Sequence, residues 1–118
     1  NVLGYLLLAD SQVSRRTLAL EPFRENARRF PRSANTYDSM GDGFLAIGQK
    51  AAALTCFAAS VRTGRAYPNE GTVTPGSAVA PASLGKMNTA ARELGRTAWT
   101  PEAIPERVVA DCLAGQAR

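Results

Sequence analysis

Residues 34–64 of this 118-residue chain read ANTYDSMGDGFLAIGQKAAALTCFAASVRTG. Apolar, aromatic and small residues recur there at helical spacing, so they line one face of each of two helices. Gly41 removes a side chain where the two backbones approach, and Gly48 suits the left-handed residue that ends a helix. The stretch therefore predicts an antiparallel helix pair at about 34–47 and 49–63, with Gly64 ending the second helix.

Eight positions of this stretch resemble the skeleton of the tetratricopeptide repeat, a family of helix-turn-helix repeats about 34 residues long. They are Tyr37, Met40, Gly41, Phe44, Gly48, Ala53, Phe57 and Ser60. The resemblance implies an all-α fold, a short α-solenoid of antiparallel helix pairs. Independently of it, the helical spacing predicts that the large residues of the set pack at the seam between the helices.

A less regular copy of the same pattern precedes this stretch. Leu3, Gly4 and Leu7 match the first helix, and Ala19, Phe23 and Pro31 match the second helix and its closing proline. Pro22 falls inside the second helix, where it removes a hydrogen bond and clashes with the preceding turn. We therefore expect a kink or a helix restart near Pro22, and two repeat-like helix pairs over residues 1–68.

The chain changes character after the second pair. Ser33 follows Pro31 as the expected cap of the helix at 34–47. Residues 69–83 are rich in Gly, Thr, Pro, Ser and Ala and predict a linker. Residues 84–118 predict two more helices, one burying Met87 and its neighbours and a short one starting near Pro101 or Pro105 and closed by Gly115. Two repeats bury too little alone, so these helices are expected to cap the stack or to form a homodimer contact.

The tetratricopeptide resemblance also assigns a groove lined by the first helix of each pair. The expected partner-binding residues are Tyr5, Leu8, Asn35, Asp38, Asp42 and Leu45. The family's basic clamp for a peptide carboxylate is missing, because Asp38 and Asp42 stand at matching places. Two carboxylates one helical turn apart favour a basic peptide or protein segment. The alternative is that both are solvated surface carboxylates without a ligand.

No catalytic, metal or cofactor site is predicted. The chain has no histidine, which removes the commonest general base, and its two cysteines match no metal-ligand spacing. Cys56 and Cys112 sit among apolar neighbours and are expected to be buried free thiols. Ser83 and Lys86 match the S-x-x-K motif of penicillin-binding proteins, but four-residue matches arise by chance, and we expect Ser83 to cap a helix.

The leading function is therefore non-catalytic protein–protein interaction or scaffolding. The alternative, nucleic-acid or anionic-surface binding, rests on a net charge of +4 and an arginine run that interleaved glutamates can neutralise: Arg15, Arg16, Arg24, Arg28, Arg29 and Arg32. No membrane span is predicted. The chain begins without methionine inside an apolar run, so it is expected to be an excised piece of a longer protein. The tetratricopeptide resemblance implies that this piece is an accessory domain, for example of a bacterial protein. The cytoplasm is favoured as its compartment, with the periplasm as the alternative for a secreted parent.

Overall fold

The computed structural model describes residues 3–5, 20–68 and 79–115, and every regular element among these residues is helical. The predicted all-α class is confirmed for that part of the chain. The elements are α3 (Leu20–Arg29), α4 (Ala34–Ala46), α5 (Lys50–Ala66), α6 (Val79–Glu93), the 3₁₀ turn η1 (Pro101–Ala103) and α7 (Arg107–Ala114). Residues 3–5 are also helical.

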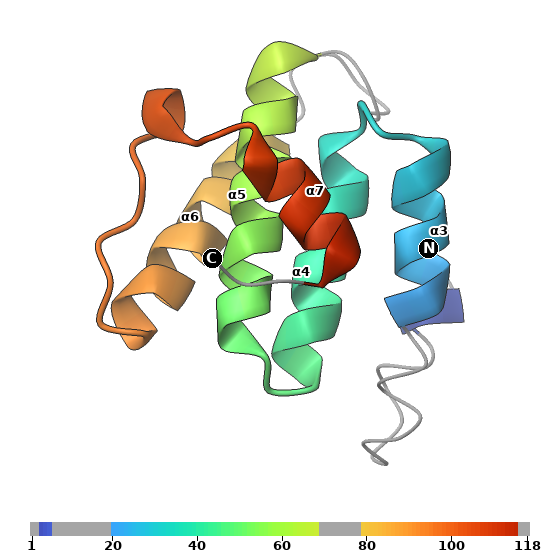
Figure 1. Cartoon of the computed structure of the whole chain (residues 1–118), viewed down its shortest axis with the longest axis horizontal. Coiled ribbons are helices and arrows are strands. Elements are labelled where there is room, and N and C mark those ends of the chain that lie inside the picture. The colour runs from blue at the N-terminus through green and yellow to red at the C-terminus, as the bar shows by residue number, and fades with distance from the viewer. Residues whose placement is uncertain (1–2, 6–19, 69–78, 116–118) are drawn as a thin grey trace.

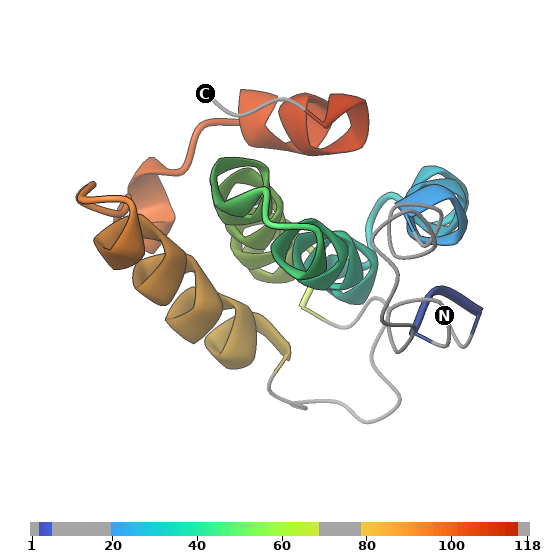
Figure 2. The same ribbon diagram turned by 90° about the horizontal axis from the view of Figure 1, so that it is seen from below.

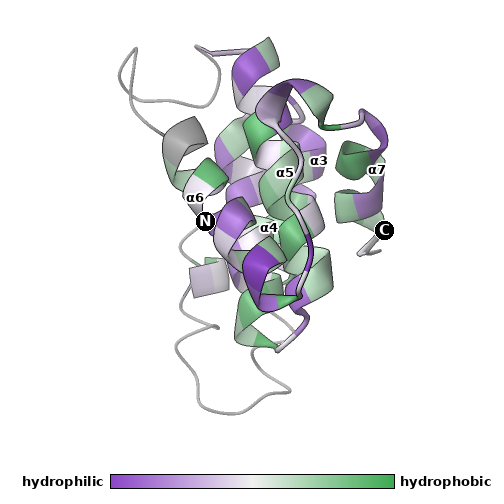
Figure 3. Ribbon diagram, turned by 90° about the vertical axis from the view of Figure 1, so that its left-hand side faces the viewer, coloured by the Kyte–Doolittle hydropathy of each residue, from purple (hydrophilic) through white to green (hydrophobic). Residues whose placement is uncertain are grey.

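Helix α5 stands at the centre of the molecule. It packs against α4, α6 and α7, while α3 covers the other side of α4. The helices α3, α4, α5 and α6 run in alternating directions (Figure 1), and α7 lies on one side of the α4–α5 pair (Figure 2). Each helix carries both hydrophobic and hydrophilic residues (Figure 3), as expected of helices that bury one face.

One hydrophobic core joins all of these helices. The side chains predicted for the α4–α5 seam are buried, with Tyr37, Met40 and Phe57 fully inaccessible. Met87 of α6 and Val108 of α7 belong to the same cluster. Trp99 is partly buried against it, so this residue anchors the segment between α6 and α7.

The α4–α5 pair has the bounds that the sequence predicts, within three residues. Gly48 adopts a left-handed φ of 83°, and the Gln49 N–H donates to the Phe44 carbonyl oxygen, which closes α4. Gly41 lies against the ring of Phe57, and a Cβ at this position would overlap the ring atoms. The glycine thus permits the close approach of the two helices. Gly115 ends α7 in the left-handed region, also as predicted.

The same small-against-aromatic contact occurs between residues 3–5 and α3. A Cβ at Gly4 would overlap the ring of Phe23, just as one at Gly41 would overlap Phe57. Tyr5 adds an edge-on contact to Phe23, with the ring centroids 5.0 Å apart. Pro22 is the third residue of α3 within its described bounds. The predicted kink upstream of it lies outside the described residues.

Three expectations for the helix ends are wrong. Gly64 does not end the second helix, because α5 continues to Ala66. Residues 79–83, predicted as linker, form the first turn of α6. Ser83 consequently lies inside α6 rather than at its cap, and its side chain is fully buried.

The expectation of free thiols is also wrong. Cys56 of α5 and Cys112 of α7 form a disulfide, with their Cα atoms 4.8 Å apart. Both residues are fully buried, as expected of cysteines with apolar neighbours. The spacing along the sequence could not reveal the pairing, because α7 reaches α5 only by folding back across the core.

Candidate functional site

The face of α4 assigned to the groove carries a polar cluster to which residues 3–5, α4, α5 and α6 all contribute. Tyr5 reaches it from residues 3–5, Asp38 and Asp42 project from α4, and Ser83 and Lys86 project from α6. The Tyr5 hydroxyl donates to Asp42 Oδ2 at 3.0 Å and lies 3.1 Å from Ser39 Oγ. The structure therefore brings together three of the six predicted groove residues, namely Tyr5, Asp38 and Asp42.

Lys86 bridges the two carboxylates. Its Nζ donates to Asp38 Oδ2 at 2.8 Å and to Asp42 Oδ1 at 3.0 Å, and it stands 5.6 Å from the centroid of the Phe57 ring. Partial burial alone would lower the pKa of Lys86, but the hydrogen bonds and negative charges of Asp38 and Asp42 outweigh it and raise the pKa. Lys86 is therefore a cation at neutral pH.

Buried hydroxyls complete the cluster beneath Lys86. Ser83 Oγ donates to Asp38 Oδ1 at 2.8 Å. Ser60 Oγ donates to the carbonyl oxygen of Ala34 at 2.8 Å and lies within hydrogen-bond distance of Ser83 Oγ, at 2.7 Å. The Asp38 side chain is only 11% exposed, so the alternative of a solvated surface carboxylate is wrong for this residue.

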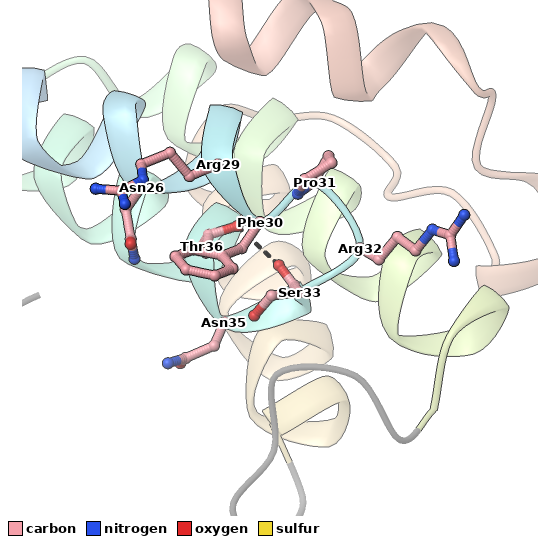
Figure 4. A pocket seen from close by; sticks show the side chains of 8 residues that line it. All are labelled: Asn26, Arg29, Phe30, Pro31, Arg32, Ser33, Asn35 and Thr36. Carbon is pink, nitrogen blue, oxygen red and sulfur yellow. Dashed lines mark hydrogen bonds between the residues drawn. The ribbon is translucent and has the colours of Figure 1, made fainter.

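The remaining groove residues lie elsewhere. Leu45 is 41% exposed at the end of α4 and lines a hollow of about 370 Å³ with Lys86 and other residues of α6. Asn35 lies at the other end of α4, in a pocket beside the end of α3 (Figure 4). Leu8 lies outside the described residues.

Comparison with family models, with curated proteins and with solved structures finds no match. The candidate site is therefore described from the contacts of its own residues. Sequence reasoning singled out Lys86 through the S-x-x-K motif but did not connect it to Asp38. No spacing rule could make that connection, because the two residues are 48 positions apart and meet only when α6 packs on α5.

The described residues contain no group of three or more Cys, Asp or Glu side chains arranged to hold a metal ion. Within the same residues, no helix has the length and apolar character needed to cross a membrane.

The arginines of the predicted basic face have different surroundings. Arg24 pairs with Glu21 and donates through Nε to the Leu113 carbonyl oxygen at 3.0 Å, so it ties α3 to α7. Arg32 stands over the Tyr67 ring at 5.1 Å. Arg28 and Arg29 are exposed at the end of α3, and Arg15 and Arg16 lie outside the described residues.

Proposed function

We propose that this chain is a non-catalytic docking module that binds a short peptide or protein segment along the face shared by α4 and α6. Asp42 binds a basic side chain of the partner, and the hollow beside Leu45 receives an apolar one. The single observation that carries the proposal is the composition of the polar cluster. Two carboxylates share one ammonium group there, directly beside an exposed apolar hollow.

The cluster has room for a second cation. Asp38 and Asp42 contribute two negative charges and Lys86 one positive charge, so these three groups together carry one unbalanced negative charge. The Asp42 side chain is 25% exposed, against 11% for Asp38, and is therefore the accessible carboxylate. Asp42 Oδ1 accepts a hydrogen bond from Lys86 and Oδ2 accepts one from Tyr5, and each oxygen has a further lone pair that a guanidinium or ammonium group can use.

The hollow next to the cluster supplies an apolar contact. Leu45 forms one wall, and α6 forms the other with small residues beside polar ones: Ala82, Gly85, Lys86, Thr89, Ala90 and Glu93. A Cβ at Gly85 would meet no atom within 4 Å, so the hollow is open at this position. A leucine or phenylalanine side chain of the partner would bury apolar area here while a neighbouring basic residue reaches Asp42.

The repeat-like contacts support this choice of face. Gly4 lies against Phe23 in the same way as Gly41 lies against Phe57, in the two stretches that resemble each other in sequence. This recurrence agrees with the tetratricopeptide resemblance, which implies a groove lined by the first helix of each copy. Residues 3–5, α4 and α6 each contribute a side chain to the polar cluster, as three consecutive first helices would.

The geometry also argues against catalysis through the S-x-x-K motif. Ser83 is fully buried and hydrogen-bonded to Asp38, so its oxygen is closed to a substrate. A general base must be unprotonated, whereas the raised pKa of Lys86 keeps it charged.

The proposal is tested with an array of fluorescent peptides, each carrying one Arg or Lys two to four residues from a Leu or Phe. The strongest binder is then measured by fluorescence anisotropy. Asp42→Asn is expected to weaken binding about tenfold, because it removes one charge-assisted contact worth about 1.4 kcal/mol. Leu45→Ser is expected to weaken binding by a similar factor because it removes the apolar wall.

Glu102→Gln is the matched control, since it removes one exposed negative charge on η1. Its affinity should equal that of the unchanged chain. The proposal is wrong if no peptide of the array binds, or if Asp42→Asn and Glu102→Gln weaken binding equally.

A further inference from the structure

The hollow beside Leu45 has a carboxylate near each end. Helices α4 and α6 run in the same direction, because each is antiparallel to α5 (Figure 1). Asp42 precedes Leu45 on α4 and is joined to the hollow by Lys86. Glu93 lines the hollow from the end of α6, two helical turns or roughly 10 Å beyond Lys86. The hollow therefore extends along α6 from the polar cluster to Glu93.

Glu93 is paired with a cation that lies outside the hollow. Its Oε2 accepts a hydrogen bond at 2.8 Å from Nζ of Lys50, the first residue of α5. The side chains of Lys50 and Glu93 are 39% and 50% exposed. An ion pair this exposed adds little stability, because water screens the charges and two long side chains must be held in one geometry. Another cation can therefore replace Lys50 at little cost.

The pair leaves one oxygen of Glu93 unused. In the described part of the chain, Oε1 accepts no hydrogen bond, whereas Oε2 receives the Lys50 ammonium group. A guanidinium group presents two parallel N–H donors and binds both oxygens of a carboxylate at once, which an ammonium group does not do. An arginine that reaches Glu93 from the hollow is therefore a stronger partner for it than Lys50.

We propose that Glu93 is a second cation subsite of the docking face, which an arginine of the partner occupies by displacing Lys50. This inference rests on the proposed function, because that function places a first basic side chain at Asp42 and an apolar one beside Leu45. Alternate residues of an extended segment point to the same side, and the first and fifth residues lie about 13 Å apart. Long basic side chains can adapt that spacing to the two carboxylates. The partner is thus an extended segment with a basic residue, a leucine or phenylalanine, and an arginine at alternate positions.

The test measures the binding of four fluorescent peptides to the whole chain by fluorescence anisotropy. Their core sequences are Arg-Ser-Leu-Ser-Gln, Arg-Ser-Leu-Ser-Arg, Arg-Ser-Leu-Ser-Lys and Arg-Ser-Leu-Arg-Ser. The peptide ending in Arg should bind about fivefold more tightly than the one ending in Gln, as one added charge-assisted contact predicts. The Lys peptide should gain less, because it makes a single hydrogen bond. The last peptide has the same charge but the wrong spacing, and it should gain less than the correctly spaced Arg peptide.

Two variants should change the advantage of the second arginine in opposite directions. This advantage is the ratio of the dissociation constants of the Gln and Arg peptides. Glu93→Gln should bring the ratio close to one, because the second carboxylate is gone. Lys50→Gln should raise the ratio about twofold or more, because the competing cation is gone. Arg96→Gln is the matched control, since Arg96 is an exposed cation near the end of α6 that does not line the hollow; it should leave the ratio unchanged.

The outcomes separate this inference from the function on which it rests. If the Gln peptide binds but the Arg peptide binds no more tightly, or if the advantage persists in Glu93→Gln, the second subsite is wrong and the docking function stands. Equal increases of the ratio in Lys50→Gln and Arg96→Gln would overturn the subsite by showing an effect of net charge. If none of the four peptides binds, the docking function and the subsite are both wrong.

The ease of displacing Lys50 has its own readout in the chain without peptide. Lys50→Gln and Glu93→Gln should both melt at the temperature of the unchanged chain, because an exposed ion pair adds little stability. A clear fall in the melting temperature of both variants would show that Lys50 is held firmly on Glu93, and the proposal would fail.

Discussion

Gly41 and Gly85 both lie inside helices but differ in what surrounds them. A Cβ at Gly41 would overlap the buried Phe57 ring, whereas one at Gly85 would meet no atom within 4 Å. Gly41→Ala should therefore lower the free energy of unfolding by about 1–3 kcal/mol through overpacking, partly offset by about 1 kcal/mol of helix propensity. Gly85→Ala should raise it by about 0.5–1 kcal/mol.

Urea unfolding followed by circular dichroism measures both changes. Both substitutions add one methyl group to a helix, so the gain in helix propensity is common to them. The difference between their changes in the free energy of unfolding therefore measures the effect of the contact with Phe57. Equal stabilisation by both variants would show that α4 and α5 lie farther apart at Gly41 and Phe57 than they do in the structure.

For single residues, the sequence predicted burial but not long-range contacts. Periodicity predicts that Tyr37 and Phe57 are buried, because spacing along one helix depends only on local geometry. The surroundings of Asp38 could not be predicted, because its partners Ser83 and Lys86 meet it only through the packing of α6 on the α4–α5 pair. The disulfide was missed for the same reason, since Cys112 meets Cys56 only through the packing of α7.

Among the elements, α7 depends most on its tertiary contacts. It has eight residues, too few for a stable isolated helix in water. Val108 buries its inner face, Arg24 donates to the carbonyl oxygen of Leu113, and the disulfide ties Cys112 to α5. The sequence predicted this helix and its stop at Gly115, because both depend on local signals.

Removing the disulfide should destabilise the whole fold. Its cysteines are separated by 56 residues, so closing this loop removes roughly 4 kcal/mol of chain entropy from the unfolded state. We expect that reductant, or the double substitution Cys56→Ala and Cys112→Ala, lowers the free energy of unfolding by up to about that amount. Urea unfolding with and without reductant measures this loss of stability. The unfolding of the double variant should not change when reductant is added.

The pairing itself can be checked by titrating thiols in the urea-unfolded chain. Without reductant no free thiol should be detected, and with reductant both should react. Two free thiols before reduction would contradict the disulfide of the structure. They would support the sequence expectation that Cys56 and Cys112 are buried free thiols.

At the scale of the molecule, residues before and after position 78 share one core. Met87 of α6 and Val108 of α7 are buried in the same cluster as Phe23, Tyr37 and Phe57. The sequence predicted that two helix pairs need a cap, since each pair leaves an apolar face open. It did not predict that α6 would also bring Lys86 to the carboxylates of α4. Because of this contact, α6 is part of the candidate site.

A chain that ends at residue 78 should therefore lose cooperative unfolding. Without α6 and α7, the faces of α5 that they cover would be open to water, and Asp38 would lose the Ser83 hydroxyl and the Lys86 ammonium group. We expect the full chain to unfold in one sharp urea transition and residues 1–78 to show a broad one with reduced helicity. Adding residues 79–118 as a separate peptide should restore helicity, because the missing surface is then supplied in trans. If residues 1–78 unfolded as sharply and at the same urea concentration as the full chain, the shared core would not govern stability, and α6 could not be an integral wall of the docking face.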